Sequence, residues 1–274
     1  MKLGIINTAY GASFENPDGY RQMKAHGYDY TDFQGLADFD SPYYTNPDLA
    51  LREREAAEAA GIRFSQLHSL WPTHETTAEG LEEKVRYMEK ALEIAPLLGC
   101  PRVVFHSEMP LGWDTDDEAL AWRANERFIA RVLPAAERAN VILCLENMPM
   151  KALSFSRVEN MIRMVEQFDH PLLGMCFDTG HAAVFGDDCA DAVRRIGRYL
   201  QALHIHDNDG TADQHRLPGD GIIDWERLRV ALREVGFDGA FSFETELSRD
   251  LPPAEREAAL LSLAAFGKHM IEKP

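Results

Sequence analysis

The chain has 274 residues, a length typical of one α/β barrel of roughly 250 residues. Hydrophobic residues make up 45% of it and charged residues 27%, as in an ordinary globular protein, so we expect one domain over residues 1–274 and no disordered tail. The formal net charge of −17 argues against nucleic acid as a partner, because binding a polyanion needs clustered Lys and Arg. The first residues lack a signal-peptide core, and no segment has the ~20 apolar residues that cross a bilayer, so we expect a cytoplasmic protein without membrane contact.

Eight apolar runs rich in β-branched and aromatic residues predict strands. In chain order they are residues 3–7 (LGIIN), 28–33 (YDYTDF), 63–69 (RFSQLHS), 102–107 (RVVFHS), 141–147 (VILCLEN), 174–179 (GMCFDT), 202–207 (ALHIHD) and 240–246 (AFSFETE). Helices are predicted at residues 16–27, 46–61, 77–98, 116–139, 154–168, 188–198, 224–236 and 253–271. Eight alternating units favour a closed (β/α)8 TIM barrel. An open Rossmann sheet is the alternative, but no G-x-G-x-x-G or P-loop motif follows any strand.

Polar side chains stand at or near the ends of six successive predicted strands, where a barrel carries its catalytic residues. They are His68, His106, Glu146, Asp178, His204 and Glu244, and they are followed by His181 after the sixth strand and by Asp213 and His215 after the seventh. One such residue is explained equally well as a helix cap or a hydrogen-bonded core group, but six in succession point to a common site. Three carboxylates at one mouth would repel each other unless a cation lies between them.

Mixed carboxylate and imidazole ligands suit Mn²⁺, Zn²⁺, Co²⁺ or Fe²⁺, and the cysteines do not stand at strand ends, so the sequence predicts a divalent-metal site whose metal stays open. We expect His204 to face the barrel and His206 to take a supporting or helix-facing position. Three aromatic residues just past strand ends are candidates either for an apolar wall against a substrate or for core packing: Trp71, Trp113 and Phe185.

Five motifs stand in a characteristic order: LENMP, FDTGH, HIHDND, D-x-H-x-x-P-G-x-G-x-I-D-W and FETE. Together they make the sequence resemble the xylose isomerase-like TIM-barrel superfamily of sugar phosphate isomerases and epimerases, which includes the tagatose/psicose 3-epimerases and endonuclease IV. The resemblance covers nearly the whole chain. It implies four metal ligands, as in the mononuclear epimerases: Glu146, Asp178, His204 and Glu244. It also implies that the two glutamates form the acid/base pair, and that His181 and Arg216 lie near positions that contact substrate oxygens.

Endonuclease IV holds a trinuclear zinc cluster, and each of its ligand types has a counterpart in this chain. In order these are His68, His106, Glu146, Asp178, His181, His204, Asp213, His215 and Glu244. The chain departs from the DNA repair enzymes after Glu146, where it reads NMPMK instead of a TAGQG-type stretch, and in its acidic charge balance. A phosphodiesterase of that type is therefore an alternative and not the favoured function.

We predict a metal-dependent isomerase or epimerase of carbohydrate metabolism that acts on a ketose or a related polyol or keto-sugar. Proton transfer would pass through a metal-stabilised enediolate. A free sugar is favoured over a phosphorylated one, because no glycine-rich loop or basic cluster follows the last two strands. An inosose dehydratase-like lyase and a non-catalytic metal-binding protein are further alternatives. A homo-oligomer is common for such barrels, but the sequence does not indicate an interface.

Overall fold

The computed structural model describes residues 1–70, 77–245, 247 and 251–272. Its eight strands are β1 (Lys2–Ile6), β2 (Tyr30–Phe33), β3 (Arg63–His68), β4 (Arg102–His106), β5 (Ile142–Glu146), β6 (Leu173–Asp178), β7 (Leu200–His204) and β8 (Ala240–Phe243). They form one parallel sheet in the order β7-β6-β5-β4-β3-β2-β1-β8. The predicted TIM barrel is confirmed, and the end of the last predicted strand, Glu246, lies outside the described residues.

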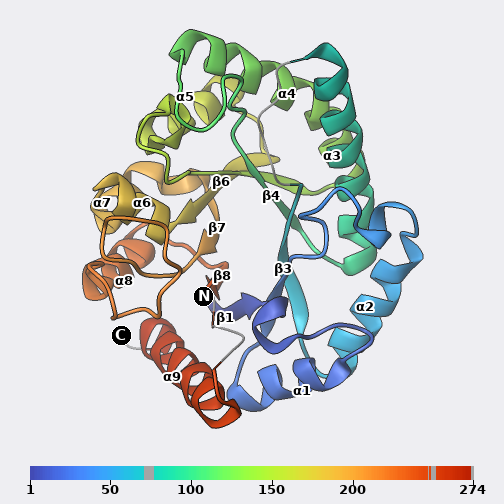
Figure 1. Cartoon of the computed structure of the whole chain (residues 1–274), viewed down its shortest axis with the longest axis vertical. Helices are drawn as coiled ribbons and strands as arrows, with labels where there is room; N and C mark the ends of the chain where they lie inside the picture. Colours follow the sequence, from blue (N-terminus) through green and yellow to red (C-terminus); the bar gives the residue numbers. More distant parts are fainter. Residues whose placement is uncertain (71–76, 246, 248–250, 273–274) are drawn as a thin grey trace.

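The barrel closes between β7 and β8, just past the end of β7. Ile205 and Phe243 form a parallel bridge there. The Ile205 backbone N–H donates to the Ser242 carbonyl at 2.9 Å, and the Glu244 N–H donates to the Ile205 carbonyl at 3.0 Å. Figure 1 shows the strands arranged around a central axis with the helices outside them.

The helices cover the outside of the strands (Figure 1). They are α1 (Pro17–His26), α2 (Asp48–Ala59), α3 (Ala78–Leu98), α4 (Glu118–Ala139), α5 (Val158–Phe168), α6 (Thr179–Phe185), α7 (Cys189–Ile196), α8 (Trp225–Glu234) and α9 (Pro253–Glu272). Aspartate caps mark where several begin: the Asp117 carboxylate accepts the Leu120 N–H, and Asp224 accepts the Arg227 N–H. Across the described part of the chain, every helix is too short or too polar to span a bilayer.

The helix α6 was not predicted, because its seven residues follow β6 without a loop. Asp178 ends the strand and also caps the helix, since its Oδ1 accepts the His181 N–H at 2.7 Å. The same carboxylate that the sequence offers as a strand-end ligand therefore starts the helix that carries His181. This short helix fixes how far His181 lies from Asp178.

The barrel interior has an apolar half and a polar half. Small buried side chains from four neighbouring strands pack together in the first half: Val104, Cys144, Cys176 and Ala202. The second half holds the buried polar side chains Asp32, Gln66 and Ser242. Gly4 belongs beside them, because a Cβ there would lie 2.8 Å from the Ser242 Oγ. The residues of the polar half stand on β1, β2, β3 and β8.

Candidate metal centre

Four predicted ligands meet at the C-terminal mouth of the barrel. Glu146, Asp178 and His204 end β5, β6 and β7, and Glu244 follows β8. One nitrogen or oxygen atom from each lies within 4.8 Å of the others. The His204 Nδ1 is 2.6 Å from the Glu146 Oε1 and 3.0 Å from the Glu244 Oε2. The first three side chains are buried and Glu244 is nearly so, which makes this a dry, highly charged cluster.

The two glutamates of this cluster have lowered pKa values despite their burial. Burial opposes the charged form of Glu146, but His204, His106 and His68 outweigh it and hold its pKa well below the ordinary value. For Glu244 burial is likewise outweighed by His204, and its pKa falls to about 2. Imidazole protons thus balance the negative charge, and a divalent cation bound to the same atoms would replace them. Two or three carboxylate oxygens and one imidazole nitrogen fit such an ion.

A second group lies beside the first and contains His181, His206, Asp213 and His215. The Asp213 Oδ2 is 3.1 Å from the His181 Nε2 and 3.3 Å from the His215 Nε2. Burial lowers the pKa of both imidazoles, but neighbouring carboxylates, above all Asp178 and Asp213, outweigh it and raise each to about 10. The His206 Nε2 lies 3.0 Å from the Asp178 Oδ1 and so joins this group to the first.

A third group shares Glu146 with the first. The Glu146 Oε2 is 3.2 Å from the His68 Nε2 and 3.2 Å from the His106 Nε2. The two imidazole nitrogens are 3.1 Å apart, and the three side chains are buried. All nine predicted ligand positions therefore gather at one mouth in three overlapping groups.

The remaining predicted residues take other positions. The Arg216 Nη2 pairs with the Asp209 Oδ2 at 2.8 Å, so its guanidinium is held by the rim loop and not by the buried carboxylates. Phe185 packs under the Arg157 guanidinium, 5.2 Å from its ring centroid, and Trp113 is partly exposed. Trp71 lies outside the described residues.

Of the two positions expected for His206, supporting or helix-facing, the helix-facing one is wrong. Residues two apart on an extended strand point to the same face, so His206 follows His204 toward the mouth. Its ring is fully buried and stacks on the His215 ring with the centroids 3.9 Å apart. The period of two was visible in HIHDND and was sufficient to place it there.

Two further residues that the sequence did not single out hold the site in place. Asn147 pairs with the Asp178 backbone: its Nδ2 donates to the Asp178 carbonyl at 2.9 Å, and its Oδ1 accepts the Asp178 N–H at 2.8 Å. Its own carbonyl lies 2.7 Å from the His181 Nδ1 and orients that ring. Asp207, also buried, accepts four N–H groups of the following loop.

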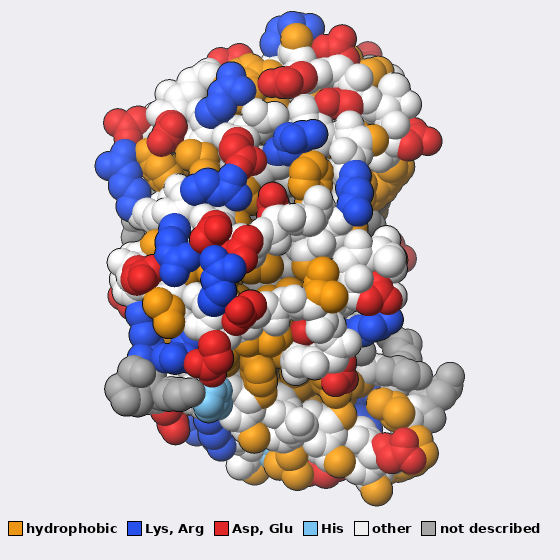
Figure 2. Space-filling view, turned by 90° about the vertical axis from the view of Figure 1, so that its left-hand side faces the viewer, with side chains coloured by type: hydrophobic (Ala, Val, Ile, Leu, Met, Phe, Trp, Pro, Cys, Tyr) orange, Lys and Arg blue, Asp and Glu red, His pale blue; other side chains and the backbone are white. Residues whose placement is uncertain are grey.

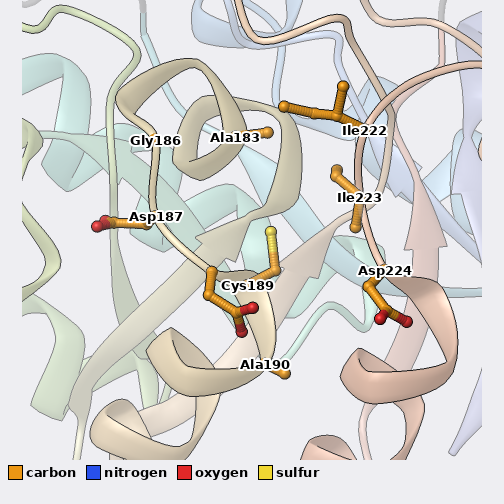
Figure 3. A pocket seen from close by; sticks show the side chains of 9 residues that line it. Ala183, Gly186, Asp187, Cys189, Ala190, Ile222, Ile223 and Asp224 are labelled. Atoms are coloured by element: carbon orange, nitrogen blue, oxygen red, sulfur yellow. The ribbon is translucent and has the colours of Figure 1, made fainter.

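A pocket also lies outside the mouth, between the α6–α7 turn and the residues before α8. Figure 3 shows Ile222 and Ile223 facing Ala183 and Cys189 across it. None of the nine predicted ligands lines this pocket. On the outer face that carries α7 and α8, acidic and basic side chains alternate (Figure 2), and Arg194 and Arg227 there form ion pairs with neighbouring carboxylates.

Comparison with known proteins identifies the family. Residues 20–266 match the family model of the xylose isomerase-like TIM barrel, so the chain belongs to this family. The D-psicose 3-epimerase of Ruminiclostridium cellulolyticum is 25% identical over 256 residues, which cover 89% of this chain and 83% of that protein. The uncharacterized protein y4fM of Sinorhizobium fredii is 28% identical over 172 residues, which cover 60% of this chain and only about half (53%) of that protein.

A further relative and two solved structures are similar to this chain. A probable endonuclease 4 of Mesomycoplasma hyopneumoniae is 30% identical over 157 residues, covering 50% of this chain and 55% of that protein. The crystal structure of D-psicose 3-epimerase with D-tagatose from Clostridium cellulolyticum superimposes with a TM-score of 0.80 at 17% identity, covering 99% of this chain and 100% of that one. The crystal structure of the IolI protein with a binding zinc atom reaches 0.73 at 20% identity, covering 98% and 96%. At these identities the structures establish the shared fold.

Proposed function

We propose that this protein is a divalent-metal-dependent isomerase or epimerase that moves a proton next to the carbonyl of a ketose, keto-sugar or related polyol derivative. The observation that carries the proposal is the convergence of Glu146 and Glu244 on the His204 Nδ1, with Asp178 beside them. The family and the D-psicose 3-epimerase relative, which is matched over most of its length, support the same chemistry.

Residues of this chain take separate roles in the proposed reaction, as metal ligands and as proton-transfer groups. Glu146, Asp178, His204 and Glu244 would hold the ion, which when bound supplies Lewis-acid stabilisation for the negative oxygen of an enediolate. One of the two glutamates takes the proton from the carbon beside the carbonyl. The other, once it has taken up a proton from a neighbouring imidazole or from solvent, delivers it either to the opposite face of that carbon, giving the epimer, or to the neighbouring carbon, giving the isomer after a proton has also moved between the two oxygens. The depressed pKa of Glu244 keeps it ionised and able to accept that proton.

Deuterium exchange tests this proposal. Ketoses incubated in D2O with the Mn²⁺-loaded protein should gain deuterium at the carbon next to the carbonyl, which NMR detects. Glu146→Gln and Glu244→Gln should each lower the exchange rate roughly 10²- to 10⁴-fold, as expected for loss of a general acid or base. Asp220→Asn removes an exposed carboxylate from the loop that follows β7 and is the control. Near-normal turnover by Glu244→Gln would refute the assignment, and loss of water from the substrate would instead identify a dehydratase.

A trinuclear phosphodiesterase is the second candidate, and one observation favours it. The two additional groups, His68 with His106 and His181 with Asp213 and His215, complete the nine ligand types at one mouth. The acidic net charge argues against a polyanionic substrate. Cleavage of an abasic-site duplex, together with three ions per chain, would establish this candidate. Ion binding without exchange or cleavage would indicate a non-catalytic metal-binding protein.

A further inference from the structure

The seam between β7 and β8 carries two of the proposed ligands. His204 lies one residue before the Ile205–Phe243 bridge on its own strand, and Glu244 lies one residue after it on the other. This bridge is the one strand-to-strand pair assigned between β7 and β8 in the described residues, whereas β4 and β5 share five register pairs. The relative position of His204 and Glu244 therefore depends on a short stretch of backbone pairing.

Side chains on the barrel floor connect the two sides of this seam. The Gln66 Nε2 donates to the Leu203 carbonyl at 3.2 Å, next to His204, and also to the Asp32 Oδ2 at 3.0 Å. The same Asp32 oxygen accepts the Ser242 hydroxyl, two residues before Glu244. A continuous line of hydrogen bonds thus runs from β7 through Gln66 and Asp32 to β8.

Local backbone geometry brings these groups together. The pairing of β2 with β3 skips Ser65, because Thr31 pairs with Phe64 and Asp32 pairs with Gln66. This irregularity lets the Ser65 hydroxyl reach the Asp32 Oδ1 while Gln66 reaches the Oδ2. Both Asp32 oxygens are thereby used, and the carboxylate is buried among donors on two strands, β3 and β8.

We infer that Asp32 is a positioning residue that clamps β7 to β8 across the barrel floor and so holds His204 and Glu244 at the spacing one divalent ion requires. The inference rests on the proposed metal centre. Asp32 does not reach the ion site itself, since its hydrogen bonds end on Ser65, Gln66 and Ser242. It acts on the ligands through the backbone on both sides of the seam.

The affinity of the protein for Mn²⁺ tests the positioning role of Asp32 and needs no substrate. Mn²⁺ added to the full chain is titrated by EPR at 25 °C, and we expect Asp32→Asn to weaken binding 10- to 100-fold, the usual effect of losing a group that orients metal ligands. The side-chain amide of the asparagine presents an NH2 group where the Asp32 carboxylate accepts hydrogen bonds. At least one of the donors Ser65, Gln66 and Ser242 therefore loses its acceptor. Ser242→Ala breaks the clamp only at β8, and a smaller weakening is expected. This variant keeps the test open if Asp32→Asn does not fold.

Thr31→Val is the matched control. It lies on the same strand, is equally buried and loses a hydrogen bond to the Ile5 carbonyl, but its hydroxyl makes no assigned hydrogen bond to Asp32, Gln66 or Ser242. Thermal unfolding is recorded for every variant, so that a general loss of stability shared with Thr31→Val is separated from loss of Mn²⁺ affinity. Wild-type affinity in both Asp32→Asn and Ser242→Ala would overturn the clamp and leave the proposed function standing. Failure of the wild type to bind Mn²⁺ or Zn²⁺ would overturn the metal centre itself.

Discussion

Asp207→Asn should loosen the loop that carries Asp213 and His215. The Asp207 Oδ2 accepts the Gly219 N–H at 2.9 Å and the Trp225 Nε1–H at 3.0 Å. The Oδ1 accepts the Asn208 N–H at 2.9 Å and the Ile223 N–H at 3.4 Å. An asparagine must place its NH2 group against one of these two pairs of donors, so two hydrogen bonds are lost whichever way the amide turns.

The amide orientation that costs less free energy is the one that loses the two hydrogen bonds to Oδ1, because the hydrogen bond from the Ile223 N–H is already long. A hydrogen bond to a charged acceptor is worth ~1.5–3 kcal/mol, so we expect a loss of about 3 kcal/mol in the free energy that keeps this loop closed. That corresponds to a roughly 100-fold larger population of the open loop, because every ~1.4 kcal/mol is a factor of ten. The loss is local, since the loop joins β7 to α8 and leaves the strand pairing intact.

Native-state hydrogen exchange measures this population directly. The Arg216 and Ile222 N–H groups donate to the carbonyls of Asp207 and Asn208 inside the loop, and their protection should fall about 100-fold in Asp207→Asn. Asp220→Asn makes the same chemical change at an exposed position of the same loop and should leave this protection nearly unchanged. Equal protection of both amides in the two variants would refute the role given to Asp207.

Three further outcomes are expected. Mn²⁺ or Zn²⁺ at a hundred times its dissociation constant should raise the free energy of unfolding by about 2.7 kcal/mol, measured as a higher Tm that EDTA reverses and Glu146→Gln lacks. Glu53→Ala should lower stability in urea by roughly 3 kcal/mol, because it removes the acceptor of Tyr20, Tyr43 and the Phe14 N–H, whereas exposed Glu55→Ala should change little. Burial raises the Asp32 pKa from 3.8 to about 6 despite opposing effects of His204 and of the Ser242 and Ser65 hydroxyls, with Glu244 adding to the rise. The metal-free wild type should therefore lose about 2 kcal/mol relative to Asp32→Asn as the pH rises from 4 to 6, measured by urea unfolding at each pH.

Most of the fold was predictable because each strand is a run of apolar residues buried on both faces, as in β6, where every residue is buried. The prediction overran at the C-terminal ends. Residues 205–207 continue the extended pattern of β7, but they pair only through single bridges at Ile205 and Asp207. A sequence pattern reports which residues favour an extended backbone and does not report whether a neighbouring strand is still alongside.

The ligand positions were predictable for the same reason that the strands were. A carboxylate or imidazole at the end of an apolar run interrupts the pattern, and Glu146 and Asp178 are conspicuous there. The groups that hold them were not predictable, because Gln66 and Asp32 meet through a register irregularity between two strands. Asp207 likewise has an ordinary place in an acidic loop, and its four donors come from residues up to 18 positions away.

The two halves of the barrel floor support the proposed ligands by different forces. Glu146 and Asp178 stand on strands whose inner side chains, among them Cys144 and Cys176, are small and apolar. Glu244 and His204 stand over hydrogen bonds that converge on Asp32, a carboxylate whose raised pKa shows that its burial costs stability. A buried group that disfavours folding is out of place in a barrel core filled elsewhere by Val, Cys and Ala, unless it performs a task that packing cannot. The hydrogen bonds that Asp32 accepts from Ser242 and Gln66 perform such a task. They are directional, and they fix the distance between β7 and β8 at the seam. Substitutions in the apolar half should therefore lower stability and metal affinity together, whereas Asp32→Asn should lower metal affinity by more than its loss of stability accounts for, because it removes hydrogen bonds that set the spacing of His204 and Glu244.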